Sequence, residues 1–322
     1  MFTIKCLKRC VFVSVLSLMV VIPLIGTANA QSAKSTTVSF GEPPWPGVTI
    51  KTGIASKVLQ ILGYKTEIHQ LAVPLILNGV AKGQIDAYLG GWTPVENPMI
   101  NPLVKKGKVA KLAPNISDAL EGLAVPRYVW KAGVHSIADL NKHAAKFDHK
   151  IYGIGAGTGI NDAVQAAIKA DKANLGKWTL VQSSTSAMLA EVKRAIRRHH
   201  WIVFLGWRPH WMNIRYSIKY LKDSDNTGTA NLKSIVYTVV PADYEKTQPN
   251  VARFLKQYRI PAKVQSKWIY DYSYKKQKEK VVIGNWMKNN TGMLTRWLEG
   301  VKTVDGKPGA QAVKDYIKQG KL

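Results

Sequence analysis

The sequence predicts an α/β fold of two lobes that close like a clamshell, each lobe a mostly parallel sheet flanked by helices. Short apolar runs rich in β-branched residues alternate with segments of helical periodicity, an order typical of a parallel sheet covered by helices. This order occurs twice along the chain. Two apolar segments, at residues 120–126 and 234–241, can carry the chain from the first lobe to the second and back.

The elements of the first lobe follow the order strand, helix, strand, helix, strand. The strands are expected over residues 37–40, 64–70 and 85–89. A helix over 51–62 places its aliphatic residues on one side and ends at Gly63. A second helix, over 74–82, has Pro74 in its first turn, where proline is tolerated.

The second lobe repeats this logic, and we expect it to have its own sheet. Its first helix is short and begins at Ser136, which opens a capping-box-like Ser-Ile-Ala-Asp sequence. Strands are expected over 150–154 and 178–182, helices over 161–169 and 186–198, and a third, buried strand ends at Gly206. The chain after residue 241 is expected to be helical, with three tryptophans spaced as packing residues: Trp268, Trp286 and Trp297.

The chain begins with the pattern of a secretion signal. Basic residues precede an apolar stretch that is short for a membrane span and interrupted by Pro23, and Ala28-Asn29-Ala30 is a cleavage site of the A-x-A type. We therefore expect cleavage after Ala30 and a soluble, exported protein. The expected division is residues 1–30 for the signal, 31–121 with 239–322 for the first lobe, and 122–238 for the second.

Charge and cysteine content narrow the class of function. The sequence has 46 Lys and Arg against 20 Asp and Glu, a net charge of +26. The basic residues are scattered and no nucleic-acid-binding motif accompanies them, so we expect no nucleic-acid partner and interpret the charge as solvation or attraction to a membrane surface. Both cysteines, Cys6 and Cys10, lie in the signal, so the mature chain has no disulfide, thiol nucleophile or cysteine metal site.

Three tryptophans stand beside glycine or proline at the ends of predicted strands. Trp45 follows the first strand, Trp92 follows the strand over 85–89, and Trp207 follows Gly206 and precedes Pro209. Open α/β sheets hold their ligands at the carboxyl ends of their strands. The sequence thus predicts one aromatic-lined pocket, which suits a cation held by the faces of the rings.

Several motifs spread over the mature chain make it resemble the substrate-binding proteins of ABC transporters for quaternary amines, of the glycine betaine and choline type. They include Gly91-Trp92-Thr93-Pro94, Leu123-Ala124-Val125-Pro126, Ile151-Tyr152-Gly153-Ile154, Met188-Leu189-Ala190-Glu191-Val192 and Gly206-Trp207-Arg208-Pro209-His210-Trp211. The segment Trp297-Leu298-Glu299-Gly300-Val301 is similar to the choline-binding branch. The resemblance implies a type II-like periplasmic receptor, expected to be a monomer, that closes on its ligand and docks on an inner-membrane permease.

The resemblance also implies site residues. Trp45, Trp92 and Trp207 fall where the family has the tryptophans of an aromatic box around a trimethylammonium group. A quaternary ammonium has no N–H to donate, so ring faces can recognise it where hydrogen bonds cannot.

The polar end of the expected site departs from the family pattern. Gly47 stands where choline-type members have an acidic residue, and Glu121 stands where a fourth aromatic is expected. Thr158, with Asn161 nearby, occupies the place of an asparagine contact. Glu121 could supply the missing negative charge, or it could be a buried carboxylate paired with a lysine or arginine such as Arg208. In the case of a betaine, Arg208 or the helix start after Thr158 could receive the ligand carboxylate.

The expected function is capture of a quaternary ammonium compound and its delivery to an ABC importer. Two alternatives stay open: a periplasmic receptor for another amine or an amino-acid-like solute, and an enzyme on the same fold. No Gly-x-Ser-x-Gly elbow or nucleophile with its base stands out, so no enzyme is expected. The histidines lack metal-ligand spacing and Gly157-Thr158-Gly159 lacks the rest of a P-loop, so neither a metal nor a cofactor is expected.

Overall fold

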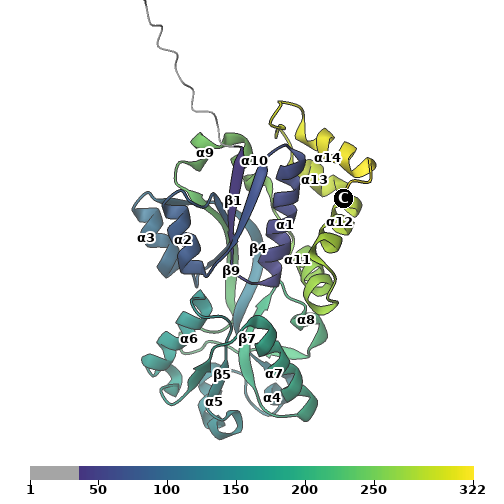
Figure 1. The fold of residues 1–322 in the computed structure, drawn as a ribbon. Coiled ribbons are helices and arrows are strands. Elements are labelled where there is room, and N and C mark those ends of the chain that lie inside the picture. Colours follow the sequence, from purple (N-terminus) through teal and green to yellow (C-terminus); the bar gives the residue numbers. More distant parts are fainter. Residues whose placement is uncertain (1–35) are drawn as a thin grey trace, which may run out of the picture. The chain divides into compact units, whose positions relative to one another are not determined.

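The structure, a computed structural model, describes residues 36–322, so the expected signal and its cleavage site lie outside the described residues. Within that part of the chain the strands form one sheet in the order β2-β1-β3-β9-β4-β7-β5-β6, with β8 paired to β4 (Figure 1). The strands are β1 (Thr37–Glu42), β2 (Lys65–Gln70), β3 (Ala87–Thr93), β4 (Val109–Pro126), β5 (Lys150–Tyr152), β6 (Thr179–Val181), β7 (Val203–Arg208), β8 (Ile218–Tyr220) and β9 (Leu232–Pro241).

Each half of the sheet has parallel outer strands, while the strands that cross between the halves are antiparallel. β1 pairs in parallel with β2 and β3, and β5 pairs in parallel with β6 and β7. β4 and β9 pair antiparallel with each other, and they connect to β7 and β3 respectively. The second lobe therefore has no sheet of its own: the long strand β4 begins at Val109, well before the apolar segment in which the crossing was expected, and joins both halves.

Helices flank both halves of this curled mixed sheet, which confirms the predicted two-lobed α/β class (Figure 1). They are α1 (Pro46–Ile61), α2 (Val73–Ala81), α3 (Asn97–Lys105), α4 (Arg127–Lys131), α5 (Ile137–Lys142), α6 (Gly159–Lys169), α7 (Thr185–Arg198), α8 (Met212–Arg215), α9 (Tyr244–Thr247), α10 (Pro249–Gln257), α11 (Ala262–Ile269), α12 (Glu279–Asn289), α13 (Thr291–Trp297) and α14 (Gly309–Lys318). The remaining elements are two short 3₁₀ helices, η1 (Ala144–Phe147) and η2 (Lys172–Asn174), and a short π-helix, η3 (Tyr270–Tyr274).

The first residues of α5 and α1 show how local sequence determines where a helix begins. The capping box before α5 is present: Asp139 Oδ2 accepts hydrogen bonds from the backbone N–H of Ser136 at 2.9 Å and from its hydroxyl at 2.8 Å. α1 begins at Pro46 and not at residue 51, because proline needs no hydrogen-bonded N–H in a first turn. This earlier start makes Trp45 the residue that caps α1.

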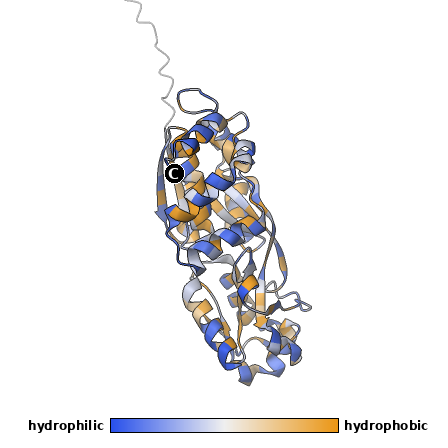
Figure 2. Ribbon diagram, turned by 90° about the vertical axis from the view of Figure 1, so that its right-hand side faces the viewer, coloured by the Kyte–Doolittle hydropathy of each residue, from blue (hydrophilic) through white to orange (hydrophobic). Residues whose placement is uncertain are grey.

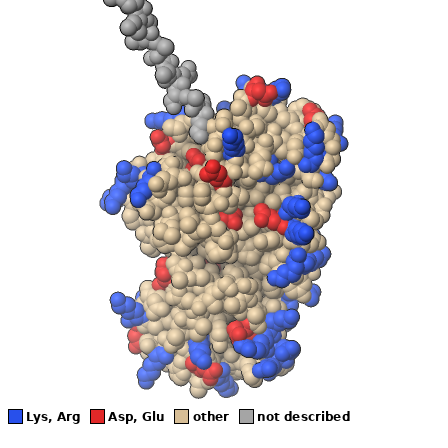
Figure 3. Space-filling view, in the orientation of Figure 1, with Lys and Arg blue, Asp and Glu red and all other residues tan. Residues whose placement is uncertain are grey.

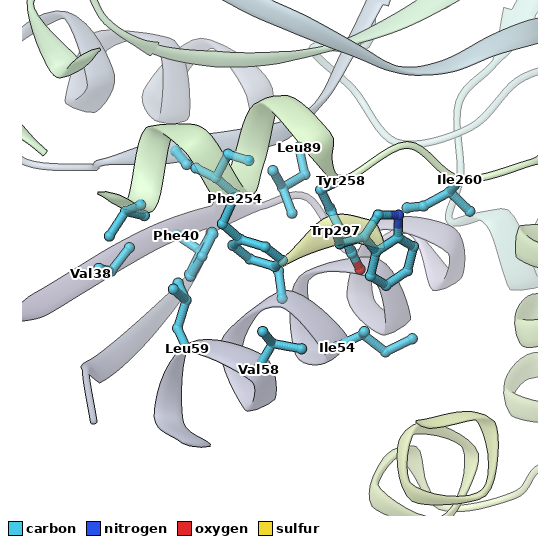
Figure 4. Packing of buried hydrophobic residues seen from close by; sticks show 14 of the residues in the cluster. Val38, Phe40, Ile54, Val58, Leu59, Leu89, Phe254, Tyr258, Ile260 and Trp297 are labelled. Carbon is cyan, nitrogen blue, oxygen red and sulfur yellow. The ribbon is translucent and has the colours of Figure 1, made fainter. Parts of the chain in front are cut away.

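The buried apolar residues form separate cores on the two sides of the crossing strands. One core joins β1, α1 and the C-terminal helices, and Figure 4 shows Phe40, Leu59, Phe254 and Trp297 among its members. A second core is built almost entirely from residues 123–230. A smaller cluster packs α2 and part of α3 against β3 and β9. Each side of the fold thus has its own apolar interior.

The chain is strongly basic, with 46 Lys and Arg against 20 Asp and Glu. Figure 2 shows the apolar residues concentrated on the strands and on the helices packed against them. Lys and Arg are scattered over the face seen in Figure 3 and do not form one patch. Among residues 36–322, no helix has the length and apolarity needed to cross a membrane.

Candidate ligand-binding site

The three tryptophans singled out in the sequence line one cavity at the crossing between the two halves of the fold. Trp45 caps α1, Trp92 lies in β3, and Trp207 lies in β7. Trp92 is buried, whereas Trp45 and Trp207 are half-buried. Trp207 packs against both main cores, so its ring lies where the halves meet.

The strands that carry Trp92 and Trp207 extend further than the sequence pattern indicated. β3 continues through Gly90 and Gly91 to Thr93, so that Trp92 is a strand residue. β7 likewise continues through Gly206 to Arg208 and ends before Pro209, which has no N–H for the ladder. In the antiparallel register Trp207 stands opposite Glu121 of β4. The backbone therefore fixes the carboxyl group of Glu121 next to Trp207.

Glu121 lines the cavity and has 5% of its surface exposed. Its Oε1 accepts a hydrogen bond from the Ser234 hydroxyl at 2.9 Å, and no ion pair of Glu121 is found among residues 36–322. Arg208 is exposed, and its guanidinium lies 6.0 Å from the centre of the Tyr220 ring. Burial raises the pKa of Glu121 to about 7, while the Ser234 hydrogen bond acts to lower it. The hypothesis that Glu121 is a buried carboxylate paired with a lysine or arginine such as Arg208 is therefore wrong.

A second carboxyl group, Glu96, lines the same cavity and was missed in the sequence. It is almost fully buried, and the Tyr88 hydroxyl donates to its Oε1 at 3.2 Å. Burial, together with the charge of Glu121, raises the pKa of Glu96 well above its usual range. We therefore expect Glu96 to hold its proton while Glu121 is the carboxyl that ionises. The signal available in the sequence was the position of Glu96, four residues after Trp92 in a chain with few acidic residues.

A buried lysine, Lys51, is close enough to Glu96 for the charge of Glu96 to affect its pKa. Lys51 of α1 is fully buried, and its ammonium donates to Asn115 Oδ1 at 2.8 Å. Burial lowers the pKa of Lys51 to about 7, and the charge of Glu96 acts in the opposite direction. Lys51 does not line the cavity, so the residues that do line it include two carboxyl groups and neither Lys nor Arg.

The two residues expected near the Gly-rich turn have different places. Thr158 lines the cavity, and its buried hydroxyl has no hydrogen-bond partner in the described structure. Asn161 does not line the cavity, which corrects its expected place in the site. Its Oδ1 accepts from the N–H of Ile154 at 3.1 Å, and its Nδ2 donates to the carbonyl oxygens of Ile154 at 2.8 Å and Gly155 at 3.0 Å. Asn161 therefore holds the turn that carries Thr158.

Two further polar residues of the cavity were missed: His210 and Gln265. Gln265 comes from α11, and its position explains how the chain tolerates Gly47. A Cβ on Gly47 would lie 2.7 Å from Nε2 of Gln265, so the glutamine fills the space that a side chain at residue 47 would need. Nothing in the local sequence relates residues 47 and 265, because only the packing of α11 on α1 brings them together.

An α/β fold of two halves with a tryptophan-lined cavity at their crossing is suited to binding a small solute between the halves. The chain belongs to the family described as the substrate binding domain of ABC-type glycine betaine transport systems (OpuAC), whose model matches residues 36–289. This membership confirms the family inferred from the sequence motifs.

Individual relatives agree with the family. A choline binding protein of an ABC transporter, solved in complex with choline, has a TM-score of 0.84 and 30% identity, covering 88% of this chain and 98% of its own. Lactococcal OpuAC in its closed form with glycine betaine has a TM-score of 0.73 and 27% identity over 81% of this chain and 98% of its own. The glycine betaine/carnitine transport binding protein GbuC of Listeria monocytogenes is 32% identical over 161 residues, 50% of this chain and 53% of GbuC.

Proposed function

We propose that this substrate-binding protein captures a quaternary ammonium compound between Trp45, Trp92 and Trp207 and delivers it to an ABC importer. The observation that carries the proposal is a cavity lined by three indole rings and two carboxyl groups, with no lysine or arginine. Each ring facing a cation contributes about 0.5–2 kcal/mol, with the larger values where water is excluded. The ionised form of Glu121 adds the negative charge that a desolvated cation requires.

The partner and the location that we propose are those expected of a substrate-binding protein of an ABC importer. The ligand would be handed to the permease of the importer in the inner membrane, and the protein would work in the periplasm as a monomer after removal of its signal. The cavity residues include no nucleophile paired with a base, which supports a receptor and not an enzyme.

A panel of ligands tests this function by thermal shift. We expect choline, glycine betaine, proline betaine or carnitine to raise the melting temperature, because a ligand that binds only the folded state stabilises it. The matched control is the tert-butyl analogue of choline, in which carbon replaces nitrogen and the positive charge is lost. Equal shifts with choline and this analogue, or a response to polyamines alone, would contradict a box for quaternary amines.

We also propose that the two halves are lobes that close on the ligand, with residues 31–121 and 239–322 in one lobe and 122–238 in the other. The separate cores support this division. So do the crossing strands β4 and β9, which can act as the hinge in such closures. Ile269 of α11 departs from the division, since it packs in the second core.

The tight contact of Gly159 with Val95 gives a test of closure. A Cβ on Gly159, the first residue of α6, would lie 2.5 Å from the carbonyl oxygen of Val95 in the other proposed lobe. We expect Gly159→Ala to hold the lobes apart and to weaken choline binding about tenfold, in line with the cost of overpacking.

Gly155→Ala is the matched control, because no described atom lies within 4 Å of a Cβ placed there. Isothermal titration of both variants measures the effect. The closure account fails if Gly159→Ala binds choline as tightly as Gly155→Ala does.

A further inference from the structure

Three residues that line the cavity each have a buried polar atom with no hydrogen-bond partner among the described residues: Thr158 Oγ1, His210 Nε2 and Gln265 Oε1. The three residues are 4%, 1% and 3% exposed. A buried polar group without a hydrogen-bond partner lowers the stability of a folded protein and is uncommon. Three such groups on the lining residues of one cavity indicate that a ligand supplies the missing hydrogen bonds. These atoms are additional to the indole rings and to Glu121.

The hydrogen-bonding role of His210 is fixed by its neighbour. The backbone N–H of Met212 donates to Nδ1 of His210 at 3.2 Å, so Nδ1 is an acceptor and the ring proton is on Nε2. Burial lowers the pKa of His210 to about 3, so the ring is neutral at ordinary pH. His210 therefore offers the ligand a neutral N–H donor.

Gln265 offers the complementary role. Its Oε1 is an acceptor that lacks a donor, and its amide nitrogen occupies the space that a side chain on Gly47 would need. The hydroxyl of Thr158 can either donate or accept. The cavity thus combines an unpaired neutral donor, an unpaired neutral acceptor and a group that can be either.

A hydroxyl group matches this set because it accepts one hydrogen bond while it donates another. A carboxylate can only accept, so it would leave Gln265 Oε1 without a donor. A carboxylate would also share the cavity with Glu121, the carboxyl that ionises, with no lysine or arginine among the lining residues to balance the two negative charges. The lining chemistry therefore favours a cation with a hydroxyl over a zwitterion with a carboxylate.

We propose that Thr158, His210 and Gln265 form a neutral polar subsite that binds a hydroxyl group of the ligand, so that the cavity prefers an N-methylated amino alcohol to a betaine. This inference rests on the proposed function, since the tryptophans hold the ammonium end. It assigns to Gln265 of α11 a specificity-determining role that sequence position alone does not suggest.

The test compares choline with propyltrimethylammonium, which has a methyl group in place of the hydroxyl and the same cationic head. Isothermal titration of the wild-type protein is expected to show choline binding at least tenfold more tightly, because the ligand without a hydroxyl leaves the polar atoms unpaired. Glycine betaine is expected to bind more weakly than choline. Equal affinities for choline and propyltrimethylammonium, or tighter binding of glycine betaine, would overturn the subsite.

Two near-isosteric variants assign the effect to residues. Gln265→Met and Thr158→Val are each expected to weaken choline binding about tenfold and to change the affinity for propyltrimethylammonium less than twofold. The retained affinity for propyltrimethylammonium also shows that the variant is folded. Thr185→Val is the control, because Thr185 is a buried threonine at the start of α7 that does not line the cavity.

The outcomes separate the two proposals. If neither trimethylammonium ligand binds the wild-type protein, the proposed function fails. If both bind and Gln265→Met leaves their ratio unchanged, the aromatic box stands and the hydroxyl subsite is wrong.

Discussion

Replacing Trp207 with alanine is expected to weaken the binding of trimethylammonium ligands about 100-fold, or ~2.7 kcal/mol. The ring lies at the crossing of the two halves and packs against both main cores. Its loss removes one face of the aromatic box and also admits water next to the cation, which weakens the attraction of the remaining rings. Trp207→Phe keeps a smaller ring and should retain part of the affinity. Titration calorimetry with choline measures both changes.

Trp201→Ala is the matched control for Trp207→Ala. Trp201 is also half-buried and packs against the second core, but it does not line the cavity. Its ring faces the Lys146 ammonium, which lies 4.4 Å from the ring centre. We expect Trp201→Ala to lower stability and leave the affinity unchanged. Equal affinities of the two alanine variants would remove Trp207 from the site.

Glu121→Gln is expected to weaken a cationic ligand such as choline about 30-fold and a zwitterion such as glycine betaine by less than threefold. The carboxylate attracts the positive head of either ligand, but in a zwitterion this gain is offset by repulsion of the ligand carboxylate. Two unit charges about 6 Å apart at an effective dielectric constant of about 20 interact by about 3 kcal/mol, which sets the scale. The measurement is the ratio of the two affinities in each protein. If both ligands lose the same factor, Glu121 is not a charge partner.

The same residue predicts how binding depends on pH. Burial raises the pKa of Glu121 from 4.5 to about 7, so the ligand-free carboxyl is largely protonated below pH 7. A bound cation favours the ionised form, and choline affinity should therefore rise as pH increases from 6 to 8, with release of a proton. The charge of Glu121 acts on the pKa values of Glu96, Tyr220 and Tyr88, and the fourth ionisable neighbour, His210 of the same cavity, has its pKa lowered to about 3 by burial and stays neutral over this range. Glu121→Gln should flatten the profile, and a profile that keeps its slope in this variant would assign the titration to another group.

Stability without ligand should change in the opposite direction. Between pH 4.5 and about 7 the carboxyl of Glu121 is ionised in the unfolded chain and protonated in the folded protein. The folded state binds more protons there, so the contribution of Glu121 to stability is lost as pH rises through 7. Thermal unfolding of the wild type and Glu121→Gln over this range provides the comparison.

The fold class could be predicted from the sequence because it depends on periodicity. The alternation of strands and helices located β1, β2, α2, α7 and β9 closely. The extent of β4 could not be predicted, since its first part includes Lys111, Pro114 and Asn115, which interrupt any apolar run. Its pairing with β9 shows register shifts at those positions, so partner strands and not local pattern define it.

The sequence predicted some residues of the candidate site and not others. Trp45, Trp92 and Trp207 stand out because each lies beside glycine or proline near the end of a predicted strand, where open α/β sheets hold their ligands. Gln265 could not be found in this way, because it is an ordinary helical residue of α11 that reaches the cavity only through packing on α1. Asn161 was misplaced because the sequence does not show that its amide is occupied by its own turn.

The most direct test of the account is a crystal structure of the protein with choline. We expect the quaternary nitrogen to lie within about 6 Å of the ring centres of Trp45, Trp92 and Trp207, the distance at which ring faces attract a cation. The hydroxyl should face Gln265 and His210. A nitrogen bound away from these three rings, or one contacted by a single ring, would contradict the aromatic box.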